Sequence, residues 1–232
     1  MVKPLHLLLL LVSFSAFSQR IAPYELFSYK ISKHMKQYAH QADQAYIDSD
    51  FQRGEFLFDS LVKNVVNGSY MDNFKMNKLS GKSIRFYDFE KPVFLMTYAS
   101  WCTPGVGEIP ALNKIAEQYH DQIDFVILFW NSKQQVKQVA GEYSSKIHIV
   151  YVDETENIHD HFIESMKHSL GFPTSFFIAQ NKQILDVRRG VLHHYNEQYA
   201  ISYELNFEAF TKGITLILTQ EVLVPETLIG QN

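Results

Sequence analysis

The chain is poor in cysteine and has no excess of charge of either sign. Its 232 residues include one cysteine, Cys102, with 10 glycines and 7 prolines, and 21 basic side chains against 25 acidic ones. This balance excludes a basic protein that coats nucleic acid, and the lack of low-complexity tracts excludes a disordered chain. A lone thiol closes no internal disulfide and supplies no cysteine-rich metal site. We therefore expect no metal and no cofactor, and any chemistry at Cys102 needs sulfur from another molecule.

Long apolar runs are lacking except near the start, where residues 1–18 read MVKPLHLLLLLVSFSAFS. An apolar run from Leu7 to Val12 and small residues at Ala16 and Ser18 are typical of an export signal cleaved before Gln19. A stable transmembrane helix needs about 20 apolar residues, more than this run offers. We predict an exported protein, in the periplasm or cell envelope if the host is bacterial, with no membrane span after cleavage. An uncleaved N-terminal anchor is the alternative.

The rest of the chain divides into three parts. Residues 19–68 carry apolar positions at helical spacing, with breaks near Asp48–Asp50 and Gly54, which predicts two amphipathic helices. Their apolar faces either pack on the next domain or serve a partner, and the sequence leaves this open. Residues 69–192 alternate strands and helices after a predicted N-terminal β-hairpin. Residues 193–232 form a linker, a C-terminal helix over Phe207–Leu218 and a tail.

The alternation of strands and helices predicts the fold class. Short apolar runs typical of buried strands alternate with helical patterns, and a second hairpin and a helix follow. This order predicts a three-layer α/β/α fold with a central mixed sheet and an extra N-terminal helical segment. A functional site is expected in the loops at the carboxyl ends of the strands.

One of those loops contains Cys102, between a strand over Pro92–Tyr98 and a helix that continues from Ile109. A thiol at a strand-to-helix junction meets free backbone N–H groups and the positive end of the helix dipole, which stabilise the thiolate. Pro104 suits the first turn of that helix. The residues therefore predict an accessible thiol with a lowered pKa. The alternative is that Cys102 is a small buried hydrophobe.

Two separated motifs carry a family resemblance. Residues 99–110 read ASWCTPGVGEIP, and residues 171–178 read GFPTSFFI. They resemble the A-S-W-C-x-P-C-x-x-E-x-P motif and the cis-proline segment of exported thioredoxin-fold proteins of the TlpA/ResA type, in the thioredoxin and AhpC/TSA-like superfamily. The resemblance extends from about Ser69 to about Val191. It implies thiol-disulfide oxidoreductase activity and a thioredoxin-like fold for this part of the chain.

The resemblance also implies roles for single residues. Cys102 would be the catalytic thiol, and a groove for substrate peptides would be formed by Trp101, Pro104, Phe172 and Pro173, with a cis bond between the last two. Glu108 would be a buried proton relay, although a favourable charge near a helix N-terminus explains it equally well.

The chain departs from the family motif at Gly105, which stands where the family has its second cysteine. In a dithiol enzyme the second cysteine resolves the mixed disulfide formed by the first. Cys102 can still attack a disulfide, but release then requires a thiol from the substrate, a small thiol or a reductase partner. A disulfide-linked homodimer through Cys102 is another outcome of this arrangement.

Other chemistries are less well supported. A peroxidase would carry threonine three residues before its cysteine, where this chain has Ala99, and the histidines of His159–His161 and His193–His194 lack the spacing of metal ligands. No basic stripe for nucleic acid is present. Two hypotheses remain. The first is an exported monothiol oxidoreductase that acts on disulfides or S-thiolated cysteines of exported proteins, and the second is a non-catalytic thioredoxin-fold module that binds peptides or partner proteins.

Overall fold

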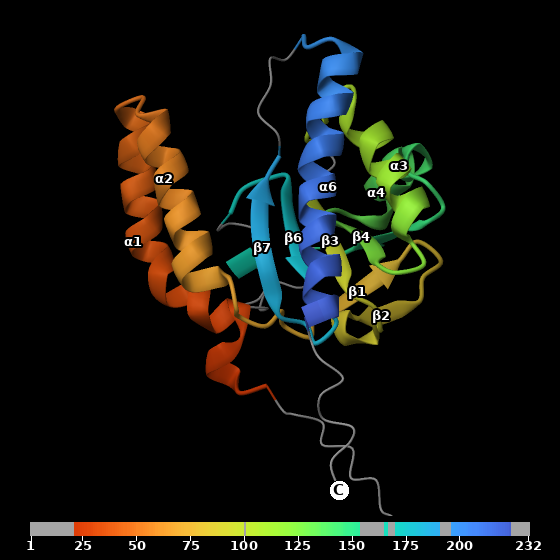
Figure 1. Ribbon diagram of the computed structural model, residues 1–232, viewed down its shortest axis with the longest axis horizontal. Coiled ribbons are helices and arrows are strands. Elements are labelled where there is room, and N and C mark those ends of the chain that lie inside the picture. The colour runs from red at the N-terminus through yellow and green to blue at the C-terminus, as the bar shows by residue number, and fades with distance from the viewer. Residues whose placement is uncertain (1–20, 100, 154–164, 167–169, 191–195, 224–232) are drawn as a thin grey trace, which may run out of the picture.

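The computed structural model describes residues 21–99, 101–153, 165–166, 170–190 and 196–223. The predicted signal peptide, Ser100 of the first motif and the two histidine pairs lie outside these ranges. Within them a seven-stranded sheet lies between two layers of helices (Figure 1). This arrangement confirms the predicted three-layer α/β/α fold.

The sheet is mixed, with the strand order β2-β1-β5-β4-β3-β6-β7. Strands β3, β4 and β5 run parallel, β6 and β7 follow antiparallel on one side, and the β1–β2 hairpin adds antiparallel to β5. The predicted N-terminal hairpin is therefore present. The strands are β1 (Lys75–Lys78), β2 (Ser83–Arg85), β3 (Val93–Tyr98), β4 (Asp124–Phe129), β5 (Ile147–Tyr151), β6 (Thr174–Ile178) and β7 (Ile184–Arg189).

The central strands are buried on both faces, which explains why they read as continuous apolar runs. Alternate residues of β3 enter two different cores: Leu95 belongs to the cluster beneath α1 and α2, and Phe94 and Met96 belong to the cluster beneath α3 and α6. The helices are α1 (Phe27–Ile47), α2 (Phe51–Leu61), α3 (Glu108–Tyr119), α4 (Lys133–Val139) and α6 (Tyr199–Leu223).

The N-terminal helices α1 and α2 pack on the domain, which answers the question that their amphipathic pattern left open. They form an antiparallel pair on one side of the sheet (Figure 1). Phe27 meets Phe176 of β6 edge-to-face, with 5.7 Å between ring centroids. The chain reverses at Asp48–Asp50, where the Asp50 carboxylate accepts a hydrogen bond of 2.9 Å from the N–H of Arg53 and caps α2.

Two predicted boundaries were wrong. Gly54 does not interrupt the second helix but lies inside α2. The C-terminal helix α6 begins at Tyr199 and not at Phe207. Its first turns escaped prediction because two of their buried positions are polar. The Ser202 hydroxyl accepts a hydrogen bond from the N–H of Gly107, and the Asn206 amide donates to the Ser202 carbonyl.

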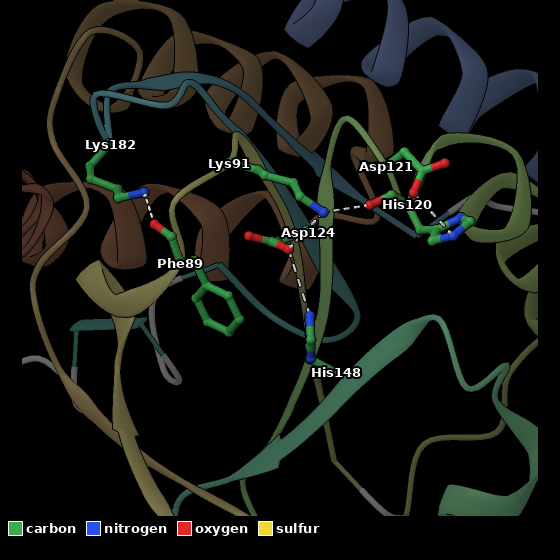
Figure 2. A network of polar contacts seen from close by, with 7 residues as sticks. All are labelled: Phe89, Lys91, His120, Asp121, Asp124, His148 and Lys182. Atoms are coloured by element: carbon green, nitrogen blue, oxygen red, sulfur yellow. Dashed lines mark hydrogen bonds and ion pairs between the residues drawn. The ribbon is translucent and has the colours of Figure 1, made fainter.

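A polar network lies at the start of β3 and β4, the opposite end of these strands from Cys102 (Figure 2). The Asp124 carboxylate lies 3.8 Å from Lys91 Nζ and 3.6 Å from His148 Nε2. Burial alone would raise the pKa of Asp124, but the His148 hydrogen bond and the Lys91 charge bring it below its ordinary value. The buried Lys182 ammonium donates to the Phe89 carbonyl at 2.5 Å. These contacts lie at the amino-terminal ends of β3 and β4, whereas Cys102 follows the carboxyl end of β3.

Across the described part of the chain, no helix combines the length and the apolar character that a membrane span requires.

Candidate functional site

Cys102 lies in the loop that follows β3. Its N–H donates a hydrogen bond of 2.9 Å to the Ala99 carbonyl, and its half-buried side chain packs against the apolar cluster beneath α3 and α6. The neighbouring Trp101 is 73% exposed and meets the Phe172 ring edge-on, with 6.1 Å between centroids. The chain thus places its only cysteine next to an aromatic pair of which Trp101 is exposed and Phe172 is partly buried.

The helix after Cys102 does not include Pro104, which was predicted to lie in its first turn. Helix α3 starts at Glu108, so Pro104 lies in the loop and not in the first helical turn. Gly105 and Gly107, which are poor helix formers, lie between Pro104 and Glu108. Pro110 has no N–H to donate to the carbonyl of Val106, four residues earlier. Both features favour a helix that starts only at Glu108. The N–H of Gly107, the N-cap residue, is already bonded to the Ser202 hydroxyl at 3.0 Å.

The predicted lowering of the thiol pKa was wrong. Burial raises the pKa of Cys102, a hydrogen bond between the thiol itself and the backbone of Ala99 opposes this effect, and the nearby charge of Glu108 raises the pKa further. The net result lies above the ordinary value for cysteine. The thiol is therefore protonated at neutral pH to a greater extent than a free cysteine.

Glu108 lies beneath the thiol loop and is 7% exposed. Its carboxylate accepts a hydrogen bond of 3.0 Å from the hydroxyl of Tyr98, the last residue of β3. Burial and then the Glu108 charge raise the pKa of Tyr98 above its ordinary range, so the phenol keeps its proton. Glu108 is thus a buried, hydrogen-bonded group at the first position of α3.

The rate of alkylation of Cys102 is expected to rise with pH, with a midpoint above the value of about 8.5 for a free cysteine. Glu108→Gln keeps the shape of the side chain and removes its charge, so the midpoint is expected to move down and the rate at pH 7 to rise. Reaction with iodoacetamide, followed by intact mass over a range of pH, measures both. A midpoint well below 8.5 in the wild type would contradict this account.

A cleft of about 880 Å³ is lined in part by the loop between β3 and α3 that contains Cys102. Its lining residues come from two parts of the chain, Thr103–Val106 with Glu108 and Gly171–Pro173 with Arg189 and Gly190. The Phe172–Pro173 peptide bond is cis. The structure therefore brings Pro104, Glu108, Phe172 and Pro173 to one cleft. Trp101 and Cys102 do not line it, but they directly precede its lining residue Thr103.

Sequence reasoning missed two groups at this cleft. Arg189 is the last residue of β7 and pairs with Thr174 of β6. The next residue, Gly190, lies so close to Pro173 that an added Cβ would be 2.7 Å from the proline ring. Pairing of the last two predicted strands would have placed Arg189 near the cis-proline segment. No sequence signal indicated its contacts with the N-terminal helices. In the described ranges, no three metal-ligating side chains come together.

Comparison with known proteins agrees with this geometry. The pattern of the AhpC/TSA family matches residues 68–187, about half of the chain. The thioredoxin-like protein YneN of Bacillus subtilis is 26% identical over 133 residues, which cover 55% of this chain and 74% of that protein. The thiol-disulfide oxidoreductase ResA of Bacillus thuringiensis is 26% identical over 126 residues, which cover 53% of this chain and 69% of that protein.

Solved structures show the same fold. The thioredoxin domain of a thiol-disulfide oxidoreductase from Bacteroides vulgatus superposes with a TM-score of 0.50 at 18% sequence identity. The superposition covers 64% of this chain and 98% of that domain. The fold of the matched region is therefore that of thioredoxin, and α1 and α2 both lie before the residues that the family pattern covers.

Proposed function

The chain belongs to the thioredoxin-like AhpC/TSA family, and we propose that it is a thiol-disulfide oxidoreductase that works through one thiol, Cys102. The observation that supports this most directly is the position of the single cysteine. It follows β3 and directly precedes Thr103, which lines a cleft together with Phe172 and Pro173. The two relatives named ResA and YneN support the same class of chemistry.

The proposed reaction needs an external thiol because Gly105 replaces the resolving cysteine. The Cys102 thiolate attacks the disulfide of an S-thiolated cysteine; a bond forms from Cys102 to the small thiol, and the client cysteine leaves as a thiolate that takes up a proton. A second small thiol then attacks this mixed disulfide, frees Cys102 and leaves as a symmetrical disulfide. The external thiols supply the two electrons that reduce the client.

We assign Glu108 the role of carrying a proton to and from the sulfur that reacts. Its burial, its hydrogen bond with Tyr98 and its effect on the pKa of Cys102 support this assignment. Trp101, Pro104, Phe172 and Pro173 are assigned to the binding of client peptide, because they line or border the cleft. The segment over residues 1–18 supports export, and we therefore propose exported proteins as clients.

A second candidate is a module that binds peptides without turnover. The raised pKa of Cys102 favours it, because the thiolate is the nucleophile and its fraction at neutral pH is small. The cleft would then bind a partner, with Cys102 forming at most a lasting mixed disulfide or a disulfide-linked homodimer.

Turnover in the presence of an added thiol separates the two candidates. With a disulfide-bonded peptide in excess, we expect one equivalent or less to react without glutathione, and many equivalents to react with it. A peptide that binds equally well to Cys102→Ala, with no turnover in the wild type under either condition, would establish the binding module and overturn the oxidoreductase.

A further inference from the structure

Arg189 connects three parts of the molecule that are far apart in the sequence. Its Nε donates a hydrogen bond of 3.1 Å to the Leu170 carbonyl, and its Nη2 donates one of 2.7 Å to the Tyr38 hydroxyl. The guanidinium also lies 4.2 Å above the centre of the Phe58 ring. Arginine suits this position because its planar fork of donors bonds in two directions while its face stacks on an aromatic ring.

The first of these contacts reaches the wall of the cleft. The loop from Leu170 leads through Gly171 and Phe172 to Pro173, and Arg189 itself lines the same cleft. The Thr174 hydroxyl donates to the Gly171 carbonyl at 2.7 Å. The loop is therefore hydrogen-bonded to the first residue of β6 and, through Arg189, to the last residue of β7. Phe172 at its end packs against Trp101, next to the thiol.

The other two contacts reach the N-terminal helices. Tyr38 lies on α1 and is 8% exposed, and Phe58 lies on α2 and is 6% exposed. Burial holds both side chains in fixed positions, where they contact Arg189. Figure 1 shows α1 and α2 beside β7, the strand that ends at Arg189. The helices are anchored in turn by the core cluster on this face of the sheet. A chain of contacts therefore runs from the hairpin of α1 and α2 to the cleft.

We propose that the α1–α2 hairpin is a working part of the thiol site: Tyr38 holds Arg189, and Arg189 holds the loop over Leu170–Pro173 at the distance from Thr103–Val106 that a client peptide requires. Tyr38 and Arg189 are positioning residues, since they act through the loop. The effect on client reactivity rests on the oxidoreductase function proposed above, whereas the effect on the loop does not.

Tyr38→Phe tests this inference, because it removes only the hydroxyl that Arg189 bonds. Tyr46→Phe is the matched control, since Tyr46 lies on the same helix and is 81% exposed. Acrylamide quenching of Trp101 fluorescence reports the position of the loop, because Trp101 packs against Phe172 of that loop. Trp130, the other tryptophan, is 3% exposed and is therefore quenched little. We expect quenching to rise in Tyr38→Phe and to stay at the wild-type level in Tyr46→Phe.

The second measurement is the rate of Cys102 with a disulfide peptide, compared with its rate with iodoacetamide. Loss of one hydrogen bond that positions the wall is expected to slow the peptide reaction about fivefold to tenfold and to leave the small reagent unaffected. Arg189→Lys keeps the charge but lacks the fork, so it is expected to give the same pattern in a second folded variant.

The outcomes separate the inference from the proposed function. A wild-type thiol that ignores the peptide would overturn the oxidoreductase, and a rise in Trp101 quenching in Tyr38→Phe would still establish the control of the loop by the hairpin. Wild-type quenching in both Tyr38→Phe and Arg189→Lys, even with a lower unfolding temperature, would reduce these contacts to simple stabilisation and overturn the inference.

Discussion

Cys102→Ser is expected to abolish thiol-disulfide exchange, with a loss of at least about 10³-fold in rate. The chain has no other cysteine, so no second thiol can substitute for the nucleophile. A serine hydroxyl keeps nearly the same size but attacks disulfides far more slowly than a thiolate. The measurement is the reduction of a disulfide peptide in the presence of glutathione, corrected for the reaction with glutathione alone.

The same variant controls for folding. Cys102 is half-buried in a loop and its N–H bond to Ala99 involves only the backbone, so the serine variant is expected to keep the wild-type unfolding temperature within a few degrees. Residual exchange above the glutathione background in Cys102→Ser would show that the observed activity comes from another component of the assay.

Gly107→Ala is expected to lower the free energy of unfolding by about 3 kcal/mol, which corresponds to about 6–12 °C in melting temperature. A Cβ on Gly107 would overlap the backbone nitrogen of Tyr203 and lie 2.5 Å from its Cα. These atoms belong to α6, so the helix must shift, and its hydrogen bond from Gly107 to Ser202 is lost. Thermal unfolding followed by circular dichroism measures the change.

Gly54→Ala is the matched control for this effect. Gly54 lies inside α2, and a Cβ added there would meet nothing within 4 Å, so alanine is expected to stabilise the helix by about 0.5–1 kcal/mol. The two glycine-to-alanine changes therefore have opposite expected signs. Equal and small effects at both positions would show that α6 does not pack against the start of α3 as described.

The strands and the layers were predictable because burial on two faces leaves a clear apolar pattern. The runs around β3 and β4 were recognised for this reason, and the break at Asp48–Asp50 was recognised from its turn and capping residues. The site was predictable as far as local motifs extend. The resemblance implied the cis bond before Pro173, and the strand-to-helix order placed Cys102 at the carboxyl end of β3.

The rest depends on contacts between distant residues. The pKa of Cys102 was predicted with the wrong sign because the sequence alone suggested a helix dipole at the thiol and showed neither its burial nor the charge of Glu108, both of which raise the pKa. Burial and the charge of a neighbouring carboxylate are properties of the packed structure. The connection of Arg189 to Tyr38 likewise spans segments that no local pattern relates.

The central claim is that Cys102 forms a mixed disulfide that an external thiol then resolves. The most direct test is intact mass spectrometry of the protein after one equivalent of a disulfide-bonded peptide, before and after glutathione is added. The account predicts a single peptide or thiol adduct that maps to Cys102, and its complete discharge to the free thiol when glutathione is in excess. A native protein that forms no adduct at any pH up to about 9, and reacts only after unfolding, would contradict it.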